Sequence, residues 1–200
     1  MVRIDVRAIC PTQKMFDPEK QRGFREAVGR SSGKVIGVIH PLFLRDRLSD
    51  PKQLELVIDN YFLIKKISSS GYFEYLQRLE HLLSTTTMPV FIFAEEGMRE
   101  VTEKWLENLP LISPTLYLDT ESGDPKPKLD GVDQPWDWVL KLTRDLGVSE
   151  ILLAGEMAYL EGDKKVGCLY EAADRLMTAN PRIMHEFTYP NMRVSYHSSA

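Results

Sequence analysis

VIGVIHP, residues 35–41, is a short run of β-branched residues that ends abruptly in a histidine and a proline. A run of this composition is typical of a strand buried on both faces of a parallel sheet. Three later runs also end in polar or ionisable residues, and most of the four lead into a segment with helical spacing. They are PVFIFAEEG (89–97), PTLYLDTESGD (114–124) and EILLAGEM (150–157).

Helical patterns separate these runs. Asp17 and Pro18 suit the N-cap and first position of a helix, and apolar residues recur at helical spacing in the later intervals. The patterns predict helices over about 17–29, 50–67, 72–83, 98–109, 133–147 and 168–177. Strands that alternate with helices predict an α/β fold, a three-layer αβα arrangement with a mostly parallel central sheet, Rossmann-like or flavodoxin-like.

The two ends of the chain alternate between apolar and polar residues. Residues 2–8 predict an edge strand. Residues 183–196 predict a strand, a turn at Pro190-Asn191 and a second short strand, an antiparallel edge hairpin. Because 200 residues usually make one domain, we expect a single α/β domain over 1–200, with 1–33 as an edge strand plus a helix appendage.

Composition excludes several classes of protein. The 43% hydrophobic and 27% charged fractions are ordinary for a soluble globular chain, and they exclude disordered and fibrous classes. No apolar run approaches the roughly 20 residues of a membrane span, and because the first ten residues lack a continuous apolar stretch we expect no signal peptide there. The formal net charge of −4 argues against nucleic acid as a partner. We expect a cytoplasmic protein that contacts no membrane and binds a small molecule.

Polar residues at the ends of the four runs are the candidates for chemistry, because ligands of parallel α/β sheets bind outside the carboxyl ends of the strands. The set is His40, Glu95, Glu96, Asp119, Glu121, Asp124 and Glu156. Carboxylates gathered there would bind Mg²⁺ or Mn²⁺, which prefer hard oxygen ligands. The predicted ligands are Glu95, Asp119, Glu121 and Glu156, and the predicted catalytic residues are His40, Glu96, Asp119 and Glu156. For each carboxylate alone, the alternative role is to cap the following helix or to be solvated.

A long aperiodic stretch follows the third run. Residues 120–133 carry several glycines and prolines and have no helical or strand spacing. Connections of this length are commonly lids or binding loops. We expect the stretch to lie over the carboxyl ends of the strands and to close over the site.

These patterns favour a metal-assisted hydrolase that acts on a phosphate-containing or other polar small molecule, if the chain is an enzyme. One alternative is a non-enzymatic α/β scaffold. It would act through a partner or as a homo-oligomer, using the aromatic tail residues Phe187, Tyr189 and Tyr196 and the basic N-terminal segment.

A second alternative comes from a resemblance. Residues 115–178 have the order strand, lysine-bearing loop, helix, strand ending in Ala-Gly, Gly-Cys and helix. This order resembles the isochorismatase-like cysteine hydrolases, although His40 stands where that family has an aspartate. The resemblance implies a hydrolase in which Cys168 is the nucleophile and Lys126 or Lys128 assists. FIFAEEG followed by LDTESGD also resembles the acidic elements of a Toprim domain, with one strand–helix unit fewer between them.

Overall fold

The computed structural model describes residues 18–50, 52, 53, 55, 64–95, 97–121, 124–128, 135–161 and 164–192. Within these ranges, apolar runs and periodic segments form the strands and helices that their patterns predict. The strands are β1 (Lys34–Ile39), β2 (Val90–Glu95), β3 (Thr115–Thr120), β4 (Glu150–Glu161), β5 (Lys164–Val166) and β6 (Pro181–Met192). The helices are α1 (Pro18–Arg30), α4 (Ser69–Thr85), α5 (Arg99–Glu107), α6 (Pro135–Leu146) and α7 (Cys168–Arg175), with a 3₁₀ turn η2 (Met177–Ala179).

The sheet is mostly parallel. Its order is β3-β2-β1-β4, with β6 parallel to β4 and β5 antiparallel to the far end of β4. The chain places β2 and β3 on one side of β1 and then returns to place β4 on the other side. The sheet therefore has its topological switch point between β1 and β4, the position at which α/β proteins of this kind bind ligands.

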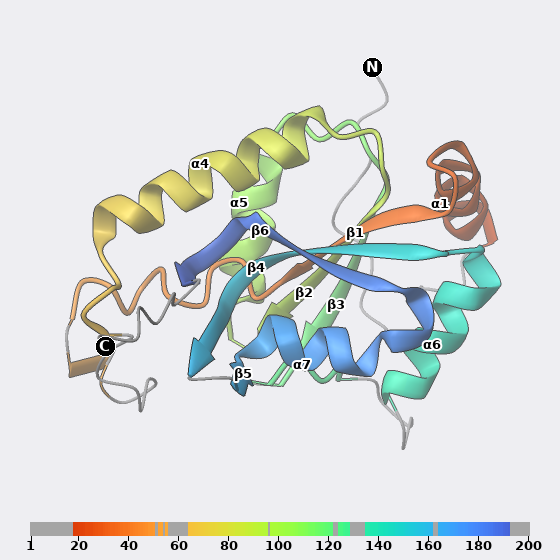
Figure 1. Cartoon of the computed structure of the whole chain (residues 1–200). Coiled ribbons are helices and arrows are strands. Elements are labelled where there is room, and N and C mark those ends of the chain that lie inside the picture. Colours follow the sequence, from red (N-terminus) through yellow and green to blue (C-terminus); the bar gives the residue numbers. More distant parts are fainter. Residues whose placement is uncertain are drawn as a thin grey trace.

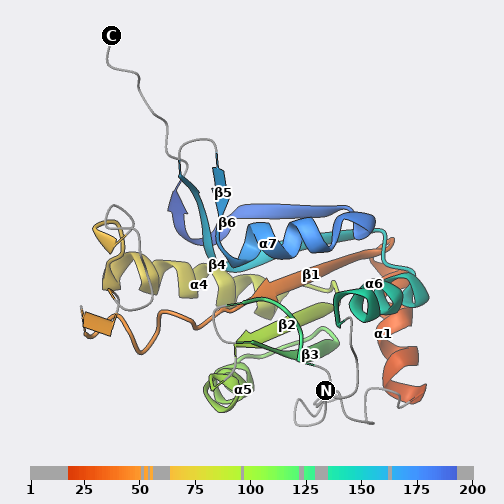
Figure 2. The same ribbon diagram turned by 90° about the horizontal axis from the view of Figure 1, so that it is seen from below.

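Helices cover both faces of the sheet (Figures 1 and 2). On one face α1 and α6 place Phe24 and Trp136 against Phe91 and Phe93 of β2, with ring centroids 5.0 and 6.2 Å apart. On the other face Trp105 of α5 donates a hydrogen bond to Glu80 of α4, at 2.7 Å. The predicted three-layer αβα fold, Rossmann- or flavodoxin-like, is confirmed.

Two local predictions differ from the structure. The turn expected at Pro190-Asn191 is wrong, because β6 continues through both residues and Asn191 is level with Ala158 of β4. The break expected between the helices at 50–67 and 72–83 is present, but the second helix begins earlier than predicted, at Ser69, since the Ser68 hydroxyl accepts a hydrogen bond from the Gly71 amide and caps α4. The edge strand expected at 2–8 and most of the helix expected at 50–67 lie outside the described residues. No helix of the described part is long and apolar enough to cross a membrane.

Strands β1 and β4 approach each other closely at the switch point. Gly155 is level with Ile39 and has a φ of +127°, and a Cβ atom there would overlap the Ile39 carbonyl oxygen. A side chain at this position would therefore both strain the backbone and push the two strands apart.

We predict that Gly155→Ala lowers the free energy of unfolding by about 3 kcal/mol, from backbone strain together with overpacking. Gly23→Ala is the matched control, because Gly23 lies within α1 and an added Cβ meets nothing within 4 Å. The control should gain up to about 1 kcal/mol from helix propensity. Urea unfolding measures both, and equal effects of the two substitutions would contradict the close approach of β1 and β4.

Candidate functional site

The strand register brings the carboxyl ends of β1 and β2 level with Gly155, in the middle of β4, which continues to Glu161. Ile39 is level with Phe93 on one side and with Gly155 on the other. The residues that follow, His40 and Glu156, therefore meet at the switch point. Both were predicted from the sequence, and both are buried, with exposed fractions of 1% and 0%.

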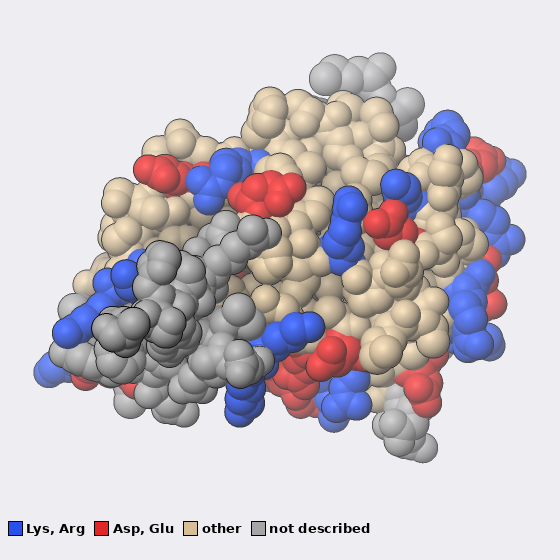
Figure 3. Space-filling view, viewed as in Figure 1, with Lys and Arg blue, Asp and Glu red and all other residues tan. Residues whose placement is uncertain are grey.

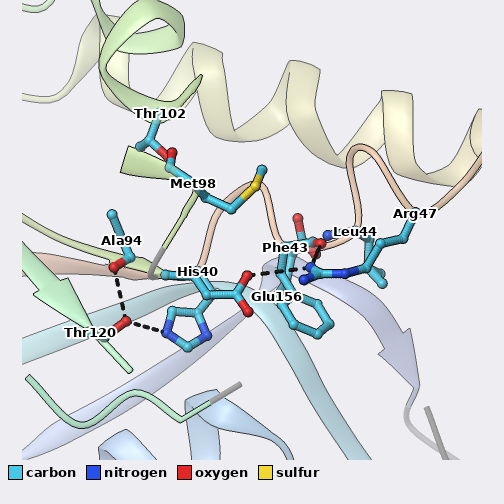
Figure 4. A network of polar contacts seen from close by, with 10 residues as sticks. His40, Phe43, Leu44, Arg47, Ala94, Met98, Thr102, Thr120 and Glu156 are labelled. Carbon is cyan, nitrogen blue, oxygen red and sulfur yellow. Dashed lines mark hydrogen bonds and ion pairs between the residues drawn. The ribbon is translucent and has the colours of Figure 1, made fainter. Parts of the chain in front are cut away.

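Glu156 is a buried carboxyl group with one hydrogen-bond partner. Its Oε2 accepts a hydrogen bond of 2.8 Å from the Leu44 amide, in the segment that follows β1 (Figure 4). Its Oε1 is buried and makes no hydrogen bond of ordinary geometry within the described residues, although the Tyr72 hydroxyl lies near enough to lower the pKa of the carboxyl group. Burial raises the pKa of Glu156 well above its ordinary value, and the nearby charge of Glu95 acts in the same direction. Burial therefore favours the uncharged, protonated form of Glu156, which can donate a proton.

His40 turns out of β1 and fills the space beside Glu156 (Figure 4). Its φ of +45° is left-handed, while its amide still continues the ladder with a 2.9 Å hydrogen bond to the Phe93 carbonyl. Its Nε2 lies 2.7 Å from the Thr120 hydroxyl, and its Nδ1 is buried without a partner. Burial, and secondarily the charge of Arg47, lowers the pKa of His40 to about 4, so the ring is neutral at physiological pH.

Glu95 lies at the end of β2 on the same side of the site. Its side chain is buried, and Oε2 is 3.4 Å from Nη1 of Arg47. The Arg47 guanidinium also donates to the Phe43 carbonyl and lies 4.2 Å from the centre of the Phe43 ring. Arg47 thus places a positive charge beside Glu95, and this charge lowers the pKa of both His40 and Glu156.

Two other predicted carboxylates, those of Asp119 and Glu121, form ion pairs with basic side chains. Asp119 pairs with Arg99 of α5 at 2.7 Å, and burial raises its pKa against the opposing effect of Arg99. Glu121 is half-exposed and lies 3.1 Å from Lys126. Glu96 lies outside the described residues. Strand alternation explains the division, since Asp119 and Thr120 point to opposite faces of β3 and only Thr120 reaches His40.

The residues that the structure describes contain no group of three or more His, Cys, Asp or Glu side chains arranged to hold a metal ion. Asp119 and Glu121 are instead engaged with Arg99 and Lys126. Binding of Mg²⁺ or Mn²⁺ stays a prediction, and no feature of the described side chains adds support to it.

Cys168 begins α7 on the side of the sheet where α6 also packs (Figure 2). The thiol is buried, and burial together with the charges of Glu171 and Glu95 raises its pKa to about 12. A nucleophilic cysteine needs the opposite shift, because the thiolate is the reactive form. Lys126, which the cysteine hydrolase alternative offers as an assistant, pairs with Glu121.

The long connection after β3 begins as an ordered turn. The Glu121 amide donates to the Lys126 carbonyl at 3.0 Å, and the Lys128 amide donates to the Asp119 carbonyl at 2.8 Å. The chain thus folds back along the end of β3, which the sequence did not predict. Residues 129–134 lie outside the described part, so closure of a lid there stays a prediction.

Tyrosines line the side of Glu156 that faces α4. Tyr72, Tyr75 and Tyr189 form a triangle with ring centroids 5.5 to 5.8 Å apart, and burial raises the pKa of each. The Tyr189 hydroxyl bonds to the backbone of Ser68, whereas the Tyr72 hydroxyl is buried beside the Glu156 carboxyl group. Tyr189, expected in an interaction surface, is therefore part of the wall of this site.

Charged side chains cover two other parts of the surface. Arg22, Arg25 and Arg30 are exposed on α1, over which basic side chains gather (Figure 3). A pocket of about 430 Å³ lies between β5 and α7 and is lined by both acidic and basic residues. They are Lys165, Val166, Gly167, Tyr170, Glu171, Asp174 and Arg175.

Comparison of the chain with protein-family models, curated proteins and solved structures finds no match. The chemistry of the site therefore has to be inferred from its own residues. Sequence patterns located His40, Glu95 and Glu156, but they missed Thr120, Arg47 and Tyr72. Thr120 was hidden between two acidic residues, and the other two reach the site from a turn and a helix.

We predict that Glu156→Gln becomes more stable than the wild type as pH rises. Wild-type Glu156 keeps its proton when folded and loses it near pH 4.5 when unfolded, so its contribution is complete below pH 4.5 and is lost above it. The difference in unfolding free energy between the variant and the wild type should grow by at most about 1.4 kcal/mol per pH unit, up to the pKa of Glu156 in the folded chain. Urea unfolding from pH 4 to 8 measures it. Glu74→Gln, at an exposed position of α4, is the control and should stay within about 0.5 kcal/mol.

His40 should have the opposite pH dependence. Its pKa falls from 6.5 to about 4 on folding, so the unfolded chain binds a proton first as pH falls. Its contribution is complete above pH 6.5 and about 3 kcal/mol is lost by pH 4. His40→Gln should remove this loss from the unfolding free energies measured between pH 7 and 4. An unchanged pH dependence in that variant would show that His40 is solvated.

Proposed function

We propose that the chain is a hydrolase that uses acid–base chemistry on a small uncharged or cationic polar molecule at the β1–β4 switch point. The observation that carries the proposal is the pair of buried, unpartnered atoms there, His40 Nδ1 and Glu156 Oε1. A buried polar atom without a partner costs free energy of the order of 1–3 kcal/mol. Two such atoms in one buried site are the feature expected where a ligand completes the hydrogen bonding.

The two groups differ in the direction in which they can transfer a proton. Neutral His40 has a free ring nitrogen to accept one, and protonated Glu156 has one to donate. Environments that shift an acid and a base in this way are typical of catalytic pairs. The separation of roles supports an enzyme over a passive binding site.

Hydrolysis of an ester or amide uses both roles in one cycle. His40 Nδ1 takes a proton from water as the water oxygen bonds to the carbonyl carbon. Glu156 then gives its proton to the leaving oxygen or nitrogen as the bond from carbon to that atom breaks. Transfer of the proton from His40 to Glu156 restores both groups, and one water is consumed for each bond broken.

The charges around the site favour a substrate without negative charge. Glu95 is paired with Arg47, and the charges of Glu171, Glu95 and Asp124 all raise the pKa of nearby Cys168, so acidic side chains influence this region. An anion such as a phosphomonoester would meet this negative potential. The proposal thus narrows the expected substrate to the polar, non-phosphorylated class.

The segment that covers the pair is the natural route for the substrate. Residues 41–49 contain turns and no helix or strand, and the Leu44 amide in this segment bonds to Glu156. Leu42 and Leu44 of this segment are buried in the core, so a substrate reaches the pair only if the segment moves. Opening here would expose His40 and Glu156 together.

We expect the wild type to hydrolyse p-nitrophenyl acetate above the uncatalysed rate and to act far less on p-nitrophenyl phosphate. His40→Gln and Glu156→Gln should each lower the rate by about 100-fold, the effect typical of one acid–base group. His81→Gln on the exposed side of α4 is the control and should leave the rate unchanged. Equal rates for all four proteins, or a preference for the phosphate, would refute the proposal.

A further inference from the structure

Thr120 stands between His40 and the backbone of β2. Its side chain is completely buried at the end of β3, where the register places Thr120 level with Glu95. The hydroxyl oxygen is 3.0 Å from the Ala94 carbonyl oxygen and 2.7 Å from His40 Nε2 (Figure 4). The hydroxyl therefore makes two hydrogen bonds, one with the Ala94 carbonyl and one with the His40 ring.

The hydroxyl has only one hydrogen to share between these bonds. A carbonyl oxygen can only accept, so the Thr120 hydrogen must go to Ala94. Towards His40 the hydroxyl can then only accept, and the hydrogen in that bond must belong to Nε2. A neutral imidazole carries one ring hydrogen, which leaves Nδ1 with a free lone pair.

From this arrangement we infer that Thr120 is a positioning residue, which holds His40 in the tautomer with hydrogen on Nε2 and a lone pair on Nδ1. The catalytic consequence of this inference rests on the proposed function, in which Nδ1 is the atom that takes the proton from water. Thr120 would act through His40 and would not touch the substrate.

The competing tautomer is disfavoured by the same contacts. A hydrogen on Nδ1 would be a buried donor at an atom that has no partner. Nε2 could then be satisfied only if the Thr120 hydroxyl turned towards it and left Ala94. An unmet buried donor costs about 1–3 kcal/mol, enough to leave the second tautomer a minor species.

The position of the hydroxyl is itself constrained. Thr120 is β-branched, which restricts its side-chain rotation, and the pairing of β3 with β2 fixes its backbone. Valine has nearly the shape of threonine without the hydroxyl, and serine keeps the hydroxyl without the methyl group. The two substitutions separate packing from hydrogen bonding.

Nitrogen NMR of the full-length chain labelled with ¹⁵N-histidine tests the inference directly, because protonated and unprotonated ring nitrogens have well-separated shifts. His40→Gln assigns the His40 signals among the four histidines. At pH 7 the wild type and Thr120→Ser should show a protonated Nε2 and an unprotonated Nδ1. Thr120→Val should show both nitrogens shifted towards intermediate values, as the two tautomers exchange.

A wild-type spectrum with hydrogen on Nδ1, or with both nitrogens intermediate, would overturn the inference. So would a Thr120→Val spectrum identical to the wild type. If the valine variant does not fold, Thr120→Ala, which removes atoms and adds none, takes its place in the comparison. The shifts report the tautomer whether or not any substrate is hydrolysed, so this test can fail while the proposed function stands, and the reverse.

Discussion

Strands β1 and β4 meet at Ile39 and Gly155 with no room for a side chain between them, and the site depends on this approach. The strand order reverses at this pair, since β2 and β3 lie on one side of β1 and β4 lies on the other. His40 and Glu156 each follow the contact by one residue, so the backbone places them side by side before any side-chain interaction is made. Because Ile39 is also level with Phe93, the end of β2 adds Glu95 to the same region.

Burial determines what these side chains can do. Glu156 is surrounded by tyrosines and by the segment after β1, and desolvation there raises its pKa by more than the nearby charge of Arg47 lowers it. His40 loses its proton for the same reason. One apolar environment thus pushes the pKa of an acid up and that of a base down. The result is a neutral donor beside a neutral acceptor at a pH where both would be charged or partly charged in water.

The sequence predicted the fold and part of the site, for reasons visible in particular residues. Parallel strands buried on both faces are continuous apolar runs, and the residue after each run falls at the ligand end of the sheet. His40, Glu95 and Glu156 could be found in this way. Which of two consecutive polar residues faces the site depends on the pleat of the strand. Asp119 was therefore predicted as a site residue, whereas the next residue, Thr120, is the one that contacts His40. The sequence patterns did not point to Arg47 and Tyr72 as site residues, because these two residues lie in a turn segment and in a helix and do not follow a strand.

The central claim is that Glu156 is an uncharged acid at the switch point, and its carboxyl carbon reports this most directly. The ¹³C signal of that carbon, assigned with Glu156→Gln, can be followed from pH 3 to pH 8 in the folded chain. We predict that the signal stays at the position of a protonated carboxyl group through pH 7. A signal that moves to the carboxylate position near pH 4.5, the ordinary value for glutamate, would contradict the account.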